Sequence, residues 1–307
     1  MNFTTNLLTS HKTLYRASTT ATFLAAAARG QVPKPILGRW LANDRLYIHA
    51  YIKGAGRFLA LLDLPDVVES SSRHDVSGHD AGDDTSAPET KPVTERLLSW
   101  LIDALVNVRR EEKFFIDVAA RFGIDVNLPT GSTPASESGS RSDRRVKDED
   151  KNAGLLAFER LFTSIATTLP HGVLLPWLAP AVLFWATEKC YLEAWSGAKD
   201  MLPSSGSATS ASGTSGQDTD TNTDLDGGAL RTEFIPNWSS PAFRAFVDEL
   251  AAIIDDGVDD AVRLHGEEAV RDELDRAQRT WREVLLAEND FWPGEMEEGG
   301  LRRIPSD

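Results

Sequence analysis

Four residues of the segment 37–62 combine one carboxylate with three aromatic rings at helical spacing. Trp40, Asp44, Tyr47 and Tyr51 stand at i, i+4, i+7 and i+11, so their side chains share one side of an α-helix. An ionised Asp on a buried face needs a hydrogen bond or a countercharge, because an isolated buried carboxylate is very costly. The pattern therefore predicts either a helix that lines a small-molecule pocket, or an Asp capped inside the core by a tyrosine or a backbone group.

Three sequence blocks, in the same order, resemble the TenA-type family, also called thiaminase II. The segment 37–62, LGRWLANDRLYIHAYIKGAGRFLALL, resembles its second helix, in which a D-x-x-Y motif matches Asp44 and Tyr47. The segment 236–256, PNWSSPAFRAFVDELAAIIDD, is similar to its W-x-S-x-x-F block, and 287–293, AENDFWP, to its E-x-x-F-W motif. The resemblance implies an all-α, haem-oxygenase-like helical bundle, usually without haem.

The resemblance also implies a reaction. Members of this family hydrolyse a 4-amino-2-methylpyrimidine that carries a leaving group on its ring methylene, and so salvage thiamin degradation products. On the matching motif positions, Asp44 is the carboxylate that binds the ring, and Tyr47 orients the site. Glu288 is the carboxyl group that protonates the leaving group.

Other positions depart from the family's pattern. The P-C-x-x-x-Y element reads PAVLFW here, which puts Ala181 in the nucleophile position and Trp185 in the tyrosine position. Phe158 and Trp238 stand where hydroxyl-bearing rings are expected, and Cys190, nine residues after Ala181, is rotated away from the nucleophile position. We expect an aromatic substrate pocket with fewer hydroxyl groups, in which stacking persists and polar recognition weakens.

A carboxylate stands near the vacant nucleophile position. Glu188 is i+7 from Ala181 and i+3 from Trp185, so it lies on the same side of the helix. The chain resembles a cysteine-lacking branch of the family that works with acidic residues, which implies that Asp44, Glu188 and Glu288 activate water. In an aromatic pocket these groups would have raised pKa values. The alternative is that Glu188 pairs with an arginine of another helix.

The ordered segments are all predicted to be helical, because none shows sustained period-two alternation. The expected helices are residues 18–29, 33–63, 93–122, 153–168, 173–199, 239–256 and 258–292. Three segments rich in Ser, Thr, Gly, Asp and Pro, at about 67–91, 127–151 and 203–230, are predicted disordered insertions. We therefore predict one helical domain, residues 1–307, with about seven helices and three insertions.

Within the helix predicted at 93–122, an apolar side is set against a charged side. Leu97, Trp100 and Leu101 lie on the first, and the run RREEK lies on the second. The pattern is typical of an amphipathic packing element.

The net charge and the cysteine and histidine content exclude several classes of binding partner and cofactor. A net charge of −15 would repel nucleic acid and anionic membranes, and no apolar run reaches the length of a membrane span. Cys190 is the single cysteine, and His49 and His265 lack companions at metal-ligand spacing, so we expect neither a disulfide nor a metal or other cofactor. A cytoplasmic location is predicted, and the resemblance implies a homo-oligomer.

Three functions remain open on the sequence. The first is an aminopyrimidine hydrolase of thiamin salvage. The second is a non-catalytic binder of a pyrimidine or thiamin derivative that has kept the scaffold and lost turnover. The third is a cofactor-independent oxidase like the related quinone-cofactor synthesis proteins.

Overall fold

The protein is an all-α bundle, as the sequence predicts. The computed structural model describes residues 2–67, 91–130, 145–168, 172–203 and 223–294, and these residues contain helices but no strand. The α-helices are α1 (Phe3–Ser10), α2 (Lys12–Thr19), α3 (Thr22–Ala28), α4 (Lys34–Leu61), α5 (Val93–Phe122), α6 (Ala153–Ser164), α7 (Leu178–Asp200), α8 (Ile235–Trp238), α9 (Pro241–His265) and α10 (Arg271–Phe291). Short helical turns are η2 (Asp148–Asp150), η3 (Leu230–Phe234) and η4 (Glu267–Val270).

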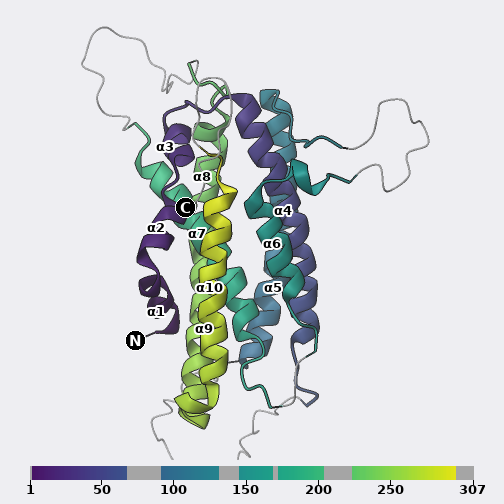
Figure 1. The fold of residues 1–307 in the computed structure, drawn as a ribbon, viewed down its shortest axis with the longest axis vertical. Coiled ribbons are helices and arrows are strands. Elements are labelled where there is room, and N and C mark those ends of the chain that lie inside the picture. Colours follow the sequence, from purple (N-terminus) through teal and green to yellow (C-terminus); the bar gives the residue numbers. More distant parts are fainter. Residues whose placement is uncertain (1, 68–90, 131–144, 169–171, 204–222, 295–307) are drawn as a thin grey trace, which may run out of the picture.

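The long helices form two groups that run side by side (Figure 1). Helices α4, α5 and α6 lie together on one side of the bundle, and α7, α9 and α10 lie together on the other. Packing of α10 on α6 and of α9 on α5 joins the two groups. The short helices α1, α2 and α3 cover the outer side of α7, α9 and α10, and α8 packs on α7. The space between the two groups is therefore enclosed by helix faces.

Local signals explain where several helices begin and end. The Asn152 side chain caps α6 by accepting a hydrogen bond from the Leu155 N–H at 2.6 Å, and Ser240 caps α9 through the Phe243 N–H at 3.3 Å. Helix α5 ends at Gly123, whose φ of 65° is the left-handed conformation that favours glycine.

The observed elements differ from the expected ones at several boundaries. The helix expected at 18–29 is divided between α2 and α3, and the helix expected from residue 173 begins at Leu178. The chain was expected to break between helices near residue 257, but α9 continues through Gly257 to His265. A Cβ at Gly257 would lie 2.6 Å from the Trp177 ring, so this glycine permits close packing within a continuous helix. The N-terminal 20 residues, for which no helix was predicted before residue 18, form α1 and α2.

Most of the three predicted insertions, at about 67–91, 127–151 and 203–230, lies outside the described residues. The flanks that are described belong to the folded structure. Lys151 bonds Glu159 at 2.9 Å, and the buried Asp226 accepts hydrogen bonds from the Gly228 and Leu230 N–H groups. The described flanks of the second and third segments therefore make local hydrogen bonds within the folded structure.

Two glycines set the spacing of the helices that carry the site. A Cβ at Gly54 would lie 2.5 Å from the Phe162 ring, and one at Gly154 would lie 2.5 Å from the Phe291 Cα. Helix α6 therefore approaches both α4 and α10 more closely than a larger residue would allow. Of the two glycines in the G-x-G pair of α4, only Gly54 has this role, since Gly56 faces open space.

Candidate functional site

A cavity of about 270 Å³ lies between the two helix groups. Side chains from α4, α5, α6, α7, α8, α9 and α10 line it, and most of the lining is apolar or aromatic. Four carboxylates, from Asp44, Glu111, Glu188 and Glu288, also line it. Aromatic walls with a few convergent polar groups are typical of a small-molecule site.

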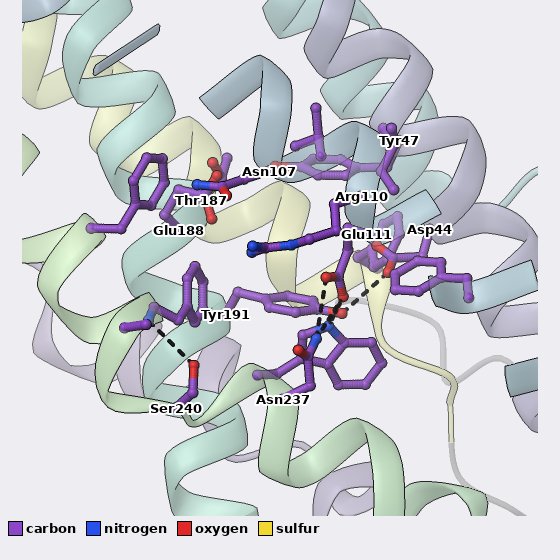
Figure 2. A pocket seen from close by; sticks show the side chains of 18 of the residues that line it. Asp44, Tyr47, Asn107, Arg110, Glu111, Thr187, Glu188, Tyr191, Asn237 and Ser240 are labelled. Atoms are coloured by element: carbon purple, nitrogen blue, oxygen red, sulfur yellow. Dashed lines mark hydrogen bonds between the residues drawn. The ribbon is translucent and has the colours of Figure 1, made fainter. Parts of the chain in front are cut away.

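Helix α4 places Asp44 in the cavity wall. Its side chain is buried, with 4% of the residue exposed, and the Tyr191 hydroxyl of α7 donates a hydrogen bond to its Oδ2 at 3.1 Å (Figure 2). Burial is the largest cause that raises the pKa of Asp44 to about 8; the carboxylates of Glu111 and Glu188 also raise it, and the hydrogen bond from Tyr191 lowers it. This carboxyl group is therefore largely protonated at neutral pH in the empty site.

Glu188 and Glu288 face the same cavity from α7 and α10. Burial raises the pKa of Glu188 to about 7, while the Tyr51 hydroxyl lowers it and Glu111 raises it. Burial, Asp44 and Glu188 together hold the pKa of Glu288 well above its usual range. Glu288 is 4% exposed and makes no hydrogen bond with any described residue. Burial therefore raises the pKa of both carboxyl groups in this cavity above the ordinary range of a glutamate.

Glu111 of α5 is the carboxylate that the sequence analysis missed. Its oxygens accept hydrogen bonds from the Trp238 indole N–H and from the Asn237 amide, the latter at 3.1 Å (Figure 2). Burial raises the pKa of Glu111, whereas these two donors and the charge of Arg110 lower it. Donors on α8 therefore hold this carboxylate in place.

Aromatic rings enclose the acidic groups. The Tyr47 ring lies 5.0 Å from that of Phe158 with an edge-to-face orientation, and Phe158 lies 5.9 Å from Phe291 in the same manner. On the other side, the ring of Tyr191 lies 5.3 Å from that of Trp238. A flat heterocycle can stack among such rings.

The sequence-predicted residues fall into two sets. Asp44, Tyr47, Phe158, Glu188, Trp238 and Glu288 all line the cavity, whereas Ala181 and Trp185 do not. Ala181 precedes Glu188 by seven residues, so it lies about 10 Å away along the axis of α7. Trp185 packs on the other flank of that helix, 5.4 Å from the Trp281 ring.

Thr187 and Tyr191 are residues of α7 that line the cavity, where the sequence analysis expected Ala181 and Trp185. They are four residues apart, as are the cysteine and tyrosine of the motif used for the assignment, but they lie six residues further along the chain. The assignment followed Pro180, which is the third residue of α7 and lies about two turns before the part of that helix that lines the cavity. Cys190 is buried and lies outside the lining, and burial raises the pKa of its thiol well above the usual range.

Residues 109–113, RREEK, were placed on the charged side of an amphipathic helix, opposite its apolar packing side, but Arg110 and Glu111 line the cavity. The sequence did contain a helical period that includes Glu111. Trp100, Ala104 and Glu111 stand at i, i+4 and i+11, positions of the same series that includes Asp44 in α4. The charged run concealed the continuation of the apolar stripe to Phe115.

Among the described residues, no group of three or more His, Cys, Asp or Glu side chains is arranged to hold a metal ion. No helix in the described ranges is long and apolar enough to cross a membrane.

Comparisons with known proteins identify a fold. No family model matches the chain, and no curated protein sequence matches it. The X-ray structure of PF1337, a TenA homologue from Pyrococcus furiosus, superposes with a TM-score of 0.58 at 18% sequence identity, covering 94% of this chain and 98% of that chain. The chain therefore has the helical fold of that TenA homologue over nearly its whole length.

Proposed function

We propose that the protein hydrolyses a substituted 4-amino-2-methylpyrimidine, of the kind released when thiamin is degraded, at the bond between the ring methylene and an amine nitrogen. The observation that carries the proposal is the shared cavity, in which Asp44, Glu188 and Glu288 converge among aromatic rings. The fold common to this chain and a TenA homologue supports it.

Asp44 binds the amidine-like edge of the ring. The exocyclic amine donates to one carboxyl oxygen, and the other oxygen shares its proton with the adjacent ring nitrogen. Because the pKa of Asp44 is about 8, the acid supplies that proton itself, and the bound pair gains ionic character. Tyr191, which donates to Asp44, fixes the carboxyl group in place.

Glu188 and Glu288 divide the proton transfers. Glu188 accepts a proton from water while the water oxygen forms a bond to the methylene carbon. The bond from that carbon to the amine nitrogen breaks, its electron pair goes to nitrogen, and Glu288 donates the proton that the leaving amine needs. A proton then passes from Glu188 to Glu288 through solvent and restores the site. The products are the hydroxymethyl pyrimidine and an amine.

A non-catalytic pyrimidine binder is the second candidate. Among the described residues that line the cavity there is no cysteine, and the Thr187 hydroxyl donates to the Phe184 carbonyl at 2.8 Å. A scaffold that had lost its nucleophile would retain Asp44 and the aromatic walls, and so would bind a ring without turning it over.

Thermal-shift measurements with the aminomethyl pyrimidine and its formylamino derivative, followed by assays for released ammonia from the first and formamide from the second, separate the two candidates. A hydrolase raises Tm with these ligands and releases product. Binding without product at any pH supports the binder, and no shift with any aminopyrimidine contradicts both.

A further inference from the structure

One cation belongs to this acidic cavity. Among the described residues of the lining, Arg110 alone carries a cationic side chain. Arg110 is exposed although it lines the cavity, so it stands at the opening, and Figure 2 shows its side chain reaching across the pocket. Any ligand that fills the cavity passes this guanidinium.

The guanidinium of Arg110 has no hydrogen-bond or ion-pair partner among the described residues, although acidic groups surround it. Its charge acts on the carboxyl group of Glu111. The interior carboxylates take other donors: Tyr191 for Asp44, and Trp238 with Asn237 for Glu111. The preceding residue behaves differently, since Arg109 bonds Glu112. The five N–H donors of Arg110 thus remain available at the opening.

The neighbouring groups suit an acceptor with several oxygens. The side chains of Asn107 and Ser240 line the same cavity and can each donate a hydrogen bond. A guanidinium binds carboxylates and phosphates through two parallel N–H···O bonds, which fix the position of the anion as well as its charge. Burial raises the pKa of both Asp44 and Glu288, so the interior repels an anion less than four carboxylates with ordinary pKa values would.

We propose that the opening of the cavity is a subsite for an anionic group of the ligand, a carboxylate or a phosphate, which Arg110 binds. The natural ligand is then dipolar: its basic ring enters the cavity to reach Asp44, and its anionic substituent stays at Arg110. The placement of the ring rests on the proposed function, whereas the anion subsite rests on Arg110.

Calorimetric titration of three pyrimidines tests the subsite. The probes share the 4-amino-2-methylpyrimidine ring and carry a hydroxymethyl group, its phosphate monoester or a carboxymethoxymethyl group. We expect the anionic probes to bind the native protein at least about tenfold more tightly than the uncharged one. Whichever anionic probe binds more tightly identifies the group that the subsite takes.

Two matched variants locate the effect. Arg110→Met should abolish the preference for the anionic probes and leave the affinity for the uncharged probe within about twofold. Arg109→Met makes the same charge change one residue away and should retain the preference, because Arg109 does not line the cavity. Retention of the preference in Arg110→Met, or its loss in Arg109→Met, overturns the assignment.

A second series keeps this test independent of the pyrimidine. Phenyl phosphate and benzoate are compared with benzyl alcohol in the native protein and in both variants. If the uncharged pyrimidine does not bind but the benzene anions show the Arg110-dependent preference, the proposed function fails and the subsite stands. If no anionic probe of either series binds more tightly than its uncharged analogue, the subsite is wrong.

Discussion

Asp44 and Glu288 are both buried carboxylates, but their contacts differ. Asp44 is held by Tyr191, whereas Glu288 has no hydrogen-bond partner among the described residues. The first is therefore fixed for recognition, and the second is available for a proton that the ligand needs during the reaction.

At the residue scale, this difference predicts separate effects on binding and turnover. Asp44→Asn removes the group that shares a proton with the ring and should weaken binding by about 100-fold, or about 2.7 kcal/mol. Glu288→Gln should leave Kd within about threefold and lower kcat by about 10²- to 10⁴-fold. Titration calorimetry and steady-state kinetics measure the two quantities. Equal loss of binding in both variants would show that the roles are not divided.

The pH dependence of turnover depends on Glu188. With a pKa of about 7, Glu188 gains the ionised form that accepts a proton as pH rises through neutrality, so kcat should rise over that range. At higher pH, kcat should fall as Glu288 loses the proton that it donates. Glu188→Gln should remove the rising limb. Glu193→Gln is the control, because Glu193 also lies on α7 but pairs with Lys189 outside the cavity lining.

Cys190 provides a test of the missing thiol. It is fully buried and absent from the cavity lining, so Cys190→Ser should leave kcat within about twofold while lowering stability by about 1–3 kcal/mol for the buried hydroxyl. Kinetics at a temperature where the variant is folded provide the comparison. A folded but inactive Cys190→Ser protein would mean that the thiol is the nucleophile.

At the scale of elements, the site depends on how closely the two helices α6 and α10 approach each other. Phe158 comes from α6, and Glu288 and Phe291 come from α10. Gly154 allows α6 and α10 to meet backbone against backbone. The separation of α6 and α10 therefore determines the width of the cavity between the Phe158 ring and the Glu288 carboxyl group.

Gly154→Ala should destabilise the protein and weaken ligand binding together. The added methyl group meets the Phe291 backbone, which cannot rotate away, so the helices must part at a cost of about 1–3 kcal/mol. Gly56→Ala is the matched control within α4, where the methyl group faces open space and the higher helix propensity of alanine should stabilise by roughly 0.5–1 kcal/mol. Urea unfolding and ligand titration of both variants measure the two effects. A Gly154→Ala protein of unchanged stability would contradict the close approach.

At the scale of the whole molecule, burial of these acids links stability to pH. Asp44 titrates near pH 3.8 when unfolded and at about 8 when folded, so between these values the folded state binds more protons than the unfolded state. The stability that this difference contributes is fully present at low pH and is lost as pH rises through the folded pKa.

The sign of this linkage predicts the behaviour of a variant. Relative to the native protein, Asp44→Asn should flatten the fall in unfolding free energy with pH by up to about 1.4 kcal/mol per pH unit between about pH 4 and about pH 8. Urea unfolding at a series of pH values measures the difference between the two proteins, which removes the contribution of the other acidic residues. A variant with the native slope would show that Asp44 ionises normally in the folded state.

The sequence by itself determined the helical class, because the period of 3.6 is read directly from the chain. Of the four residues that this period placed on one face of α4, Asp44 and Tyr47 line the cavity, whereas Trp40 and Tyr51 are buried outside the lining. Asp44 and Tyr47 were found in this way, and Glu288 from a motif next to buried aromatic residues. These signals depend only on residues close together in the sequence, so they can be read without knowing which helices pack against them.

Only the tertiary structure decided which turn of α7 faces the cavity and which charged residues of α5 enter it. Ala181 shares its helix with Glu188 but lies about two turns away, a distance along the axis that periodicity does not reveal. Arg110 and Glu111 belong to a charged run that is typical of a solvated face, and the arrival of α7 and α8 opposite them turns that face into the wall of the site. The side of a helix is a property of its own sequence, whereas the depth at which a residue meets the cavity is set by the helices packed around it.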